Sequence, residues 1–193
     1  MQKSYLALPT DYKPYLSVDL QKDKKLALLI NGLAILIGIA MAVPMHFVVP
    51  INTLFDLSGG LLPYTVRFIS LILGIILYMV LHEAVHGIAM KMCGTKQVKY
   101  GFTGLYAYAG SSDFYSKSAY IFIVLAPVIL WGIVLFVINF LVPQSWFWVV
   151  YIIQIANISG AAGDTYVTVR FAKLPSNILV QDNGTAMTVY TKQ

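Results

Sequence analysis

The sequence contains 193 residues, of which 59% are hydrophobic and only 11% are charged, and it carries a formal net charge of +5. This composition excludes an ordinary water-soluble domain and is typical of a membrane protein. A chain of this length is expected to form no more than one compact domain. The basic residues stand at the ends of apolar runs rather than among aromatic residues. They therefore indicate membrane orientation, and we expect no nucleic-acid partner.

Long apolar runs predict an all-α polytopic membrane protein with about four transmembrane helices. A span needs roughly 20 apolar residues to cross about 30 Å of hydrocarbon. Between the second and third helices, segment 98–110 is rich in Tyr and Gly and alternates in short stretches, which favours a short β-hairpin as much as an irregular loop. Within a single membrane-embedded domain we expect a tail at 1–25, helices at 26–50 and 65–92, a hairpin or loop at 95–116, helices at 118–142 and 146–169, and a tail at 171–193.

The distribution of Lys and Arg predicts how these helices are oriented. Twelve of the 13 basic residues lie in the two tails or in the segment between the second and third helices, and only Arg67 lies on the opposite side. We therefore expect a multi-pass protein of the cytoplasmic membrane with both termini in the cytosol. The lipid bilayer is its surroundings, and the oligomeric state is not indicated.

The second apolar run contains a cluster of ionisable residues, His82, Glu83 and His86, in the pattern HExxH. Positions four apart stack on one helix face, so both imidazoles can bind one tetrahedral Zn²⁺ ion. In this arrangement Glu83 is the catalytic acid/base, which exchanges protons with the attacking water and the leaving amine. Glu83 is the only glutamate and the two histidines are two of three in the chain, so a chance cluster in a membrane helix is a poor explanation.

A zinc site of this kind needs a third protein ligand, and the sequence offers few. The chain has one cysteine, Cys93, so a CxxC pair is excluded. The remaining histidine, His46, lies in the opposite leaflet, where we expect an interfacial role. An aspartate is left, and Asp164 is the best candidate because its depth in the fourth helix matches that of the histidines. Asp113 and Asp182 are weaker alternatives because both lie in cytosolic segments.

Asn157 lies seven residues before Asp164, two helical turns away on nearly the same face. Its amide could bind the backbone of a substrate. A hydrogen bond between helices explains the same residue at least as well.

Four segments resemble those of a known family: LHEAVHGIAM at 81–90, the Gly- and Tyr-rich stretch after it, LAP at 125–127, and ANISGAAGD, which ends at Asp164. Together they resemble small, mostly bacterial zincin membrane peptidases, which are distantly similar to the site-2 proteases. The resemblance covers about 65–185. It implies His82, His86 and Asp164 as zinc ligands and Glu83 as the acid/base. The site-2 pattern differs in placing a glycine after the aspartate, where this chain has a threonine.

The same resemblance suggests that the segment between the second and third helices holds a substrate strand by edge pairing. Gly101 and Gly104 then become candidate substrate-binding residues. We expect a change of either glycine to proline to reduce cleavage without loss of zinc.

These features predict a zinc metalloendopeptidase that hydrolyses a peptide bond within or next to the membrane segment of another protein. One alternative is a non-catalytic zinc-binding membrane scaffold or regulator. A second alternative is metal transport. The position of the ionisable residues, all at the cytosolic end of the helices, argues against it.

Overall fold

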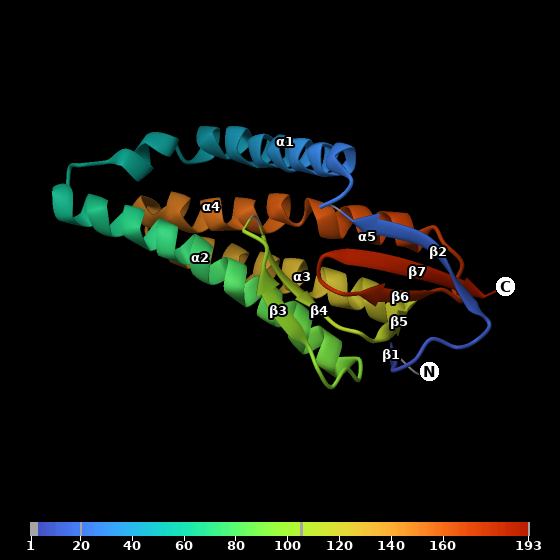
Figure 1. The fold of residues 1–193 in the computed structure, drawn as a ribbon. Coiled ribbons are helices and arrows are strands. Elements are labelled where there is room, and N and C mark those ends of the chain that lie inside the picture. The colour runs from blue at the N-terminus through green and yellow to red at the C-terminus, as the bar shows by residue number, and fades with distance from the viewer. Residues whose placement is uncertain (1–3, 20, 105, 193) are drawn as a thin grey trace. The chain divides into compact units, whose positions relative to one another are not determined.

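The computed structural model describes residues 4–19, 21–104 and 106–192 (Figure 1). The helices are α1 (Lys24–Val48), the 3-10 helix η1 (Ile51–Phe55), α2 (Leu61–Met92), α3 (Lys117–Leu141), α4 (Gln144–Gly160) and α5 (Ala162–Ala172). The strands are β1 (Ser4–Tyr5), β2 (Tyr12–Asp19), β3 (Lys99–Phe102), β4 (Ala107–Gly110), β5 (Phe114–Ser116), β6 (Leu179–Asp182) and β7 (Ala186–Lys192).

Four helical stretches are long and apolar enough to cross a membrane, judged by length and composition. They agree with the four expected spans to within four residues at every boundary, and they cover Lys24–Val48, Leu61–Met92, Lys117–Leu141 and Gln144–Ala172. The last one is interrupted, because α4 ends at Gly160 and α5 begins at Ala162. Large apolar side chains such as Leu36 and Phe140 lie exposed on these helices, as expected for surfaces that face lipid.

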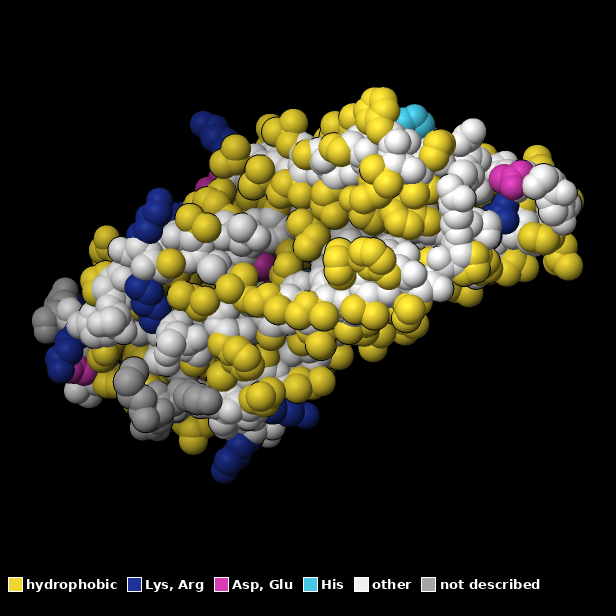
Figure 2. Space-filling view, turned by 180° about the vertical axis from the view of Figure 1, so that it is seen from behind, with side chains coloured by type: hydrophobic (Ala, Val, Ile, Leu, Met, Phe, Trp, Pro, Cys, Tyr) yellow, Lys and Arg dark blue, Asp and Glu magenta, His cyan; other side chains and the backbone are white. Residues whose placement is uncertain are grey.

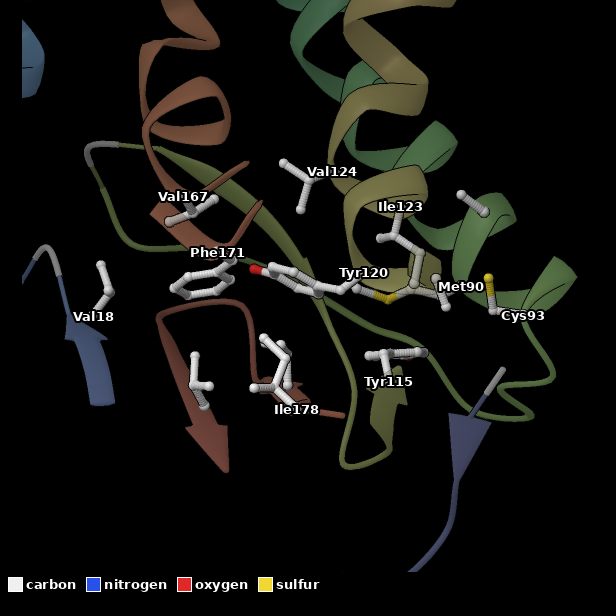
Figure 3. Close-up of a cluster of buried hydrophobic side chains, with 14 residues drawn as sticks. Val18, Met90, Cys93, Tyr115, Tyr120, Ile123, Val124, Val167, Phe171 and Ile178 are labelled. Atoms are coloured by element: carbon white, nitrogen blue, oxygen red, sulfur yellow. The ribbon is translucent and has the colours of Figure 1, made fainter. Parts of the chain in front are cut away.

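The chain forms two compact units, each assembled from separate segments. The strand unit comprises 1–30, 82–127 and 163–193, and the apolar unit comprises 31–81 and 128–162. Each has its own core. In the strand unit a cluster of buried side chains surrounds Tyr120, whose ring lies near Phe171 (Figure 3). In the apolar unit Trp148 is the largest fully buried side chain and packs with Tyr78 and Leu135.

A five-stranded antiparallel sheet lies in the strand unit, so the expectation of an all-α protein is not confirmed. The strand order is β1-β5-β6-β7-β2. Four of these strands, β1, β2, β6 and β7, lie in the segments that we expected to be tails. An Asn183–Gly184 turn joins β6 to β7, with Gly184 at φ +91°, as such hairpin turns require. The two ends of the chain therefore form one layer.

The hairpin expected between the second and third membrane helices is present. Strand β3 pairs with β4 in antiparallel register, with Tyr100 opposite Ala109. Helix α2 leads into it through Gly94, which takes φ +107°, and the N–H of Thr95 donates to the Met90 carbonyl. These features make a Schellman cap, which stops α2 shortly after the HExxH segment and turns the chain toward the hairpin.

Candidate metal centre

Helix α2 presents His82 and His86 to the same side, as their spacing predicts. The ring centroids lie 4.9 Å apart in an edge-to-face arrangement. Asp164 lies opposite them, with its Oδ2 atom 3.5 Å from Nε2 of His82 and 3.7 Å from Nε2 of His86. One potential ligand atom from each of the three residues lies within 4.8 Å of the others. The structure therefore brings together the three ligands that the sequence predicts.

Asp164 follows the break between α4 and α5 by three residues. The residue at the break, Ala161, and its neighbour Ala162 are both 1% exposed, so the chain is tightly packed where the new helix starts. Asp164 then falls in the first turn of α5. The partial positive charge at a helix N-terminus favours a carboxylate at this position.

The three side chains fit a zinc ion in donor type and in spacing. Four-coordinate zinc with ligands at about 2.0–2.2 Å holds neighbouring ligand atoms roughly 3.4 Å apart. The two distances of 3.5 and 3.7 Å from Asp164 agree with this geometry. The side chains of His82, His86 and Asp164 remain 12%, 11% and 23% exposed, so water or a substrate could approach the same point. Two imidazoles and one carboxylate leave a fourth position open, as in catalytic zinc sites.

A second contact fixes the ring of His86. Its Nδ1 atom lies 2.9 Å from the backbone carbonyl oxygen of Ile123 in α3. Because a carbonyl only accepts hydrogen bonds, Nδ1 carries a proton, and Nε2, on the side of Asp164, is the ring nitrogen that would bind a metal. This is the usual support for a metal-binding histidine.

The hairpin lies directly beside the HExxH segment. The backbone N–H of Ala109, in β4, lies near the Glu83 carboxylate. In β3, Tyr100 packs against Gly87, where an added Cβ would collide with its hydroxyl group. Both strands therefore contact α2 within one turn of His86.

The weaker alternatives for the third ligand, Asp113 and Asp182, do not join the cluster that the described residues form. Asp182 is buried, and its Oδ2 atom accepts a hydrogen bond of 2.8 Å from the Tyr120 hydroxyl. Its Oδ1 atom accepts a second bond from the N–H of Gly184. Burial raises the pKa of Asp182 above the ordinary carboxyl value. Asp182 therefore connects the sheet to α3.

Asn157 makes the interhelical hydrogen bonds that were one of its two expected roles. It is fully buried in the apolar unit. Its Oδ1 atom accepts a hydrogen bond from the Tyr78 hydroxyl, and its Nδ2 atom donates to the Val128 carbonyl. The amide is thus satisfied by neighbouring helices, which explains why it is placed in an apolar helix.

The two candidate glycines lie in the hairpin and have clear backbone reasons for being glycine. Gly101 pairs with Tyr108, and an added Cβ would collide with that ring. Gly104 takes φ +89° in the connection between the strands. His46 lies in the apolar unit, where its Nδ1 atom accepts a hydrogen bond from the N–H of Ile51.

Two groups at the site could not be found from the sequence. The Ala109 N–H and the Ile123 carbonyl belong to the backbone. Nearly every residue has these groups, so the residue type gives no indication of their roles. The position of Pro127, four residues after Ile123, is the only sequence signal connected with either group.

Comparison with known proteins assigns the chain to a family. The family described as "Putative zincin peptidase" matches residues 75–179, a range that contains His82, Glu83, His86 and Asp164. A protein of Pyrococcus woesei, described as "Uncharacterized 24.7 kDa protein in gap 5'region", is 34% identical over 151 residues. This match covers 68% of the chain and 66% of the length of that protein. No solved structure matches the chain. Since the family match covers more than half of the 193 residues, the protein belongs to this zincin peptidase family, which suggests zinc-dependent peptidase activity.

Proposed function

We propose that the protein is a zinc metalloendopeptidase that cleaves a peptide bond within or next to the membrane segment of another protein. The observation that carries this proposal is the meeting of three ligand atoms, from His82, His86 and Asp164, within 4.8 Å. Two of these residues flank the only glutamate of the chain on a helix that is apolar enough to span a membrane.

The roles of the residues follow from their chemistry. His82, His86 and Asp164 hold the ion. Zinc, when bound, polarises the scissile carbonyl and lowers the pKa of a coordinated water to about 7. Glu83 receives the proton of the attacking water and delivers it to the leaving nitrogen. The Ala109 N–H lies near the Glu83 carboxylate, where it can help to orient that group.

The substrate is proposed to be a membrane protein or an apolar peptide. Its scissile bond must reach a site on a membrane helix, close to the end that leads into the basic segment after Met92. The distribution of basic residues favours the cytosolic side of the cytoplasmic membrane for this end, with both termini in the cytosol. In its position and ligands the site is similar to that of the site-2 proteases.

The hairpin is proposed to hold the substrate in an extended form. Strands β3 and β4 pair only with each other in the part of the chain that the structure describes, so each has an edge that another strand can use. Main-chain hydrogen bonds to such an edge unwind a helical substrate locally. Because β4 contacts Glu83 through Ala109, a strand paired here would lie beside the acid/base.

The change Glu83→Gln tests the function directly. Glutamine keeps the size of the side chain but cannot accept a proton, so cleavage of apolar single-span peptides in liposomes should fall by about 100- to 10,000-fold. The zinc content of the purified variant should equal that of the native protein, because Glu83 is not a ligand.

Undiminished cleavage by this variant would contradict the proposal. If the native protein and Glu83→Gln both bind zinc and capture single-span peptides equally, yet neither cleaves them, a non-catalytic scaffold or regulator would be supported instead.

A further inference from the structure

The carbonyl group of Ile123 has an unusual place in its helix. In an α-helix each carbonyl accepts the N–H of the residue four positions later. For Ile123 that residue is Pro127, which lies inside α3 and has no N–H. The carbonyl is therefore deprived of its normal partner within the helix.

The partner that it has instead is a proposed metal ligand. Nδ1 of His86 lies 2.9 Å from the Ile123 oxygen, in a buried position. His86 and Ile123 belong to α2 and α3, and both lie in the strand unit, as does Pro127. Because Nδ1 donates to this carbonyl, Nε2 is the ring nitrogen left to bind a metal, and it lies 3.7 Å from Oδ2 of Asp164.

We infer that Pro127 is a positioning residue of the metal centre. By lacking an N–H, it reserves the Ile123 carbonyl for His86 and so fixes the tautomer and the ring orientation of this ligand. The inference rests on the proposed zinc site, but it assigns a role to a residue on another helix that is not itself one of the three proposed ligands.

A simple kink in α3 is the other explanation for Pro127, because proline bends helices wherever it occurs. The chain offers a comparison. Pro44 lies inside α1, and the carbonyl four residues earlier belongs to Ala40, which is exposed on an apolar helix. Both prolines interrupt a membrane helix, yet only Pro127 frees a carbonyl that a metal ligand uses.

The experiment replaces Pro127 by alanine and measures zinc affinity by competition with a chelator. Pro127→Ala supplies an N–H that can bond to the Ile123 carbonyl and displace His86. Loss of a supporting hydrogen bond of this kind weakens metal binding by about 10- to 100-fold. The melting temperature should stay the same or rise, since alanine favours a helix more than proline does. Pro44→Ala is the matched control, and its zinc affinity should equal that of the native protein.

A backbone ester separates the missing N–H from the shape of the proline ring. With lactic acid at position 127, the side chain is that of alanine but no N–H is present. This protein should bind zinc as tightly as the native one. In metal-free protein, ¹⁵N spectra should show a hydrogen-bonded Nδ1–H of His86 in the native and ester forms, and loss of that hydrogen bond in Pro127→Ala.

Equal zinc affinity in the native protein and Pro127→Ala would overturn the inference. So would an equal loss in Pro127→Ala and the ester form, because the ring and not the N–H would then matter. If the native protein binds no zinc, the proposed function fails, whereas the ¹⁵N spectra of the metal-free proteins still decide the role of Pro127.

Discussion

The two histidines and the aspartate are held by different kinds of local structure. His82 and His86 share one continuous helix, so their separation is fixed by helical geometry alone. Asp164 reaches them from a separate helix that starts two residues earlier, at Ala162. The carboxylate therefore depends on the position of α5, while the imidazoles depend on α2 itself.

Replacement of Asp164 by asparagine should remove the third ligand with little change in volume. Loss of a hydrogen bond that supports a metal ligand lowers affinity by up to about 100-fold. Because Asp164 is proposed as a ligand itself, we expect zinc affinity to fall by more than this. Asp113→Asn is the control, since it makes the same change at an aspartate of the strand unit that lies outside the cluster. Metal analysis of both purified variants gives the answer. Equal zinc content in the two would show that Asp164 is not a ligand.

Asp182 should make the stability of the protein depend on pH in mildly acidic solution. Burial raises the pKa of Asp182 in the folded protein above the ordinary value of 3.8. The neutral form is thus favoured by folding, and its contribution to stability is complete below pH 3.8 and is lost as the pH rises through the raised folded pKa.

Asp182→Asn imitates the neutral acid and retains an oxygen for the N–H of Gly184. The melting temperature of this variant relative to the native protein should increase as the pH rises from 3.8, and then level off. Thermal unfolding of both proteins in detergent, followed by circular dichroism across this range, is the measurement. A constant difference at every pH would show that the carboxyl group titrates normally.

The side chains that meet at the candidate site could be predicted, while the backbone groups beside them could not. HExxH spacing identifies His82, Glu83 and His86, and elimination leaves Asp164 as their partner. Asn157 was ambiguous because an amide can serve a substrate or a neighbouring helix, and only the burial of the residue decides between them.

The hairpin is the element on which the proposed substrate binding depends. Pro at position 101 would remove an N–H from β3 and place ring atoms where Tyr108 packs. We expect Gly101→Pro to reduce cleavage of single-span peptides at least tenfold, because the edge that holds the peptide is distorted, while zinc stays bound. Gly32→Ala serves as the control, since an added Cβ there meets no atom within 4 Å. Unaltered cleavage in Gly101→Pro would count against pairing at this edge.

At the level of elements, the sequence identifies helices far better than strands. Twenty or more consecutive apolar residues can hardly form anything but a membrane helix. Strand β2, in contrast, contains Lys13 and Pro14, and its pattern resembles that of a polar tail. Its partner β7 is far away in the sequence, with Tyr12 opposite Lys192, so no local pattern marks the pair. The pairing of β2 with β7 was missed because it is non-local, whereas Asn183 and Gly184 between β6 and β7 are a local turn signal.

The charges of the whole molecule are divided very unevenly between the two units. Asp56 and Arg67 are the only Asp, Glu, Lys or Arg residues of the apolar unit, and Arg67 donates a hydrogen bond to the Asp56 carbonyl. The other twelve basic residues belong to the strand unit. On the face in Figure 2, Lys and Arg side chains accordingly gather mainly over one part, and hydrophobic side chains cover most of the rest. This division supports an apolar unit surrounded by lipid.

Cysteine labelling tests the resulting topology. In a Cys93→Ala background, which removes only a buried thiol, new cysteines are placed at the exposed positions Ser58 and Ser176. In intact cells a membrane-impermeant thiol reagent should label Ser58→Cys, between η1 and α2. It should label Ser176→Cys, between α5 and β6, only after the membrane is permeabilised. Labelling of Ser176→Cys in intact cells would contradict cytosolic termini.

The pairing of β2 with β7 has a consequence for biosynthesis. Residues 12–19 leave the ribosome early, but their partners at 186–192 are translated about 10 to 35 s later at rates of 5–20 residues per second. During that interval β2 has no partner strand, while the helices that follow it are being inserted into the membrane. Lys13 and Pro14 then protect it from wrong partners, as charged residues and proline do on exposed strands. Lys13 and Pro14 thus make β2 hard to recognise as a strand in the sequence. They also keep it free to pair with β7 once β7 has been translated.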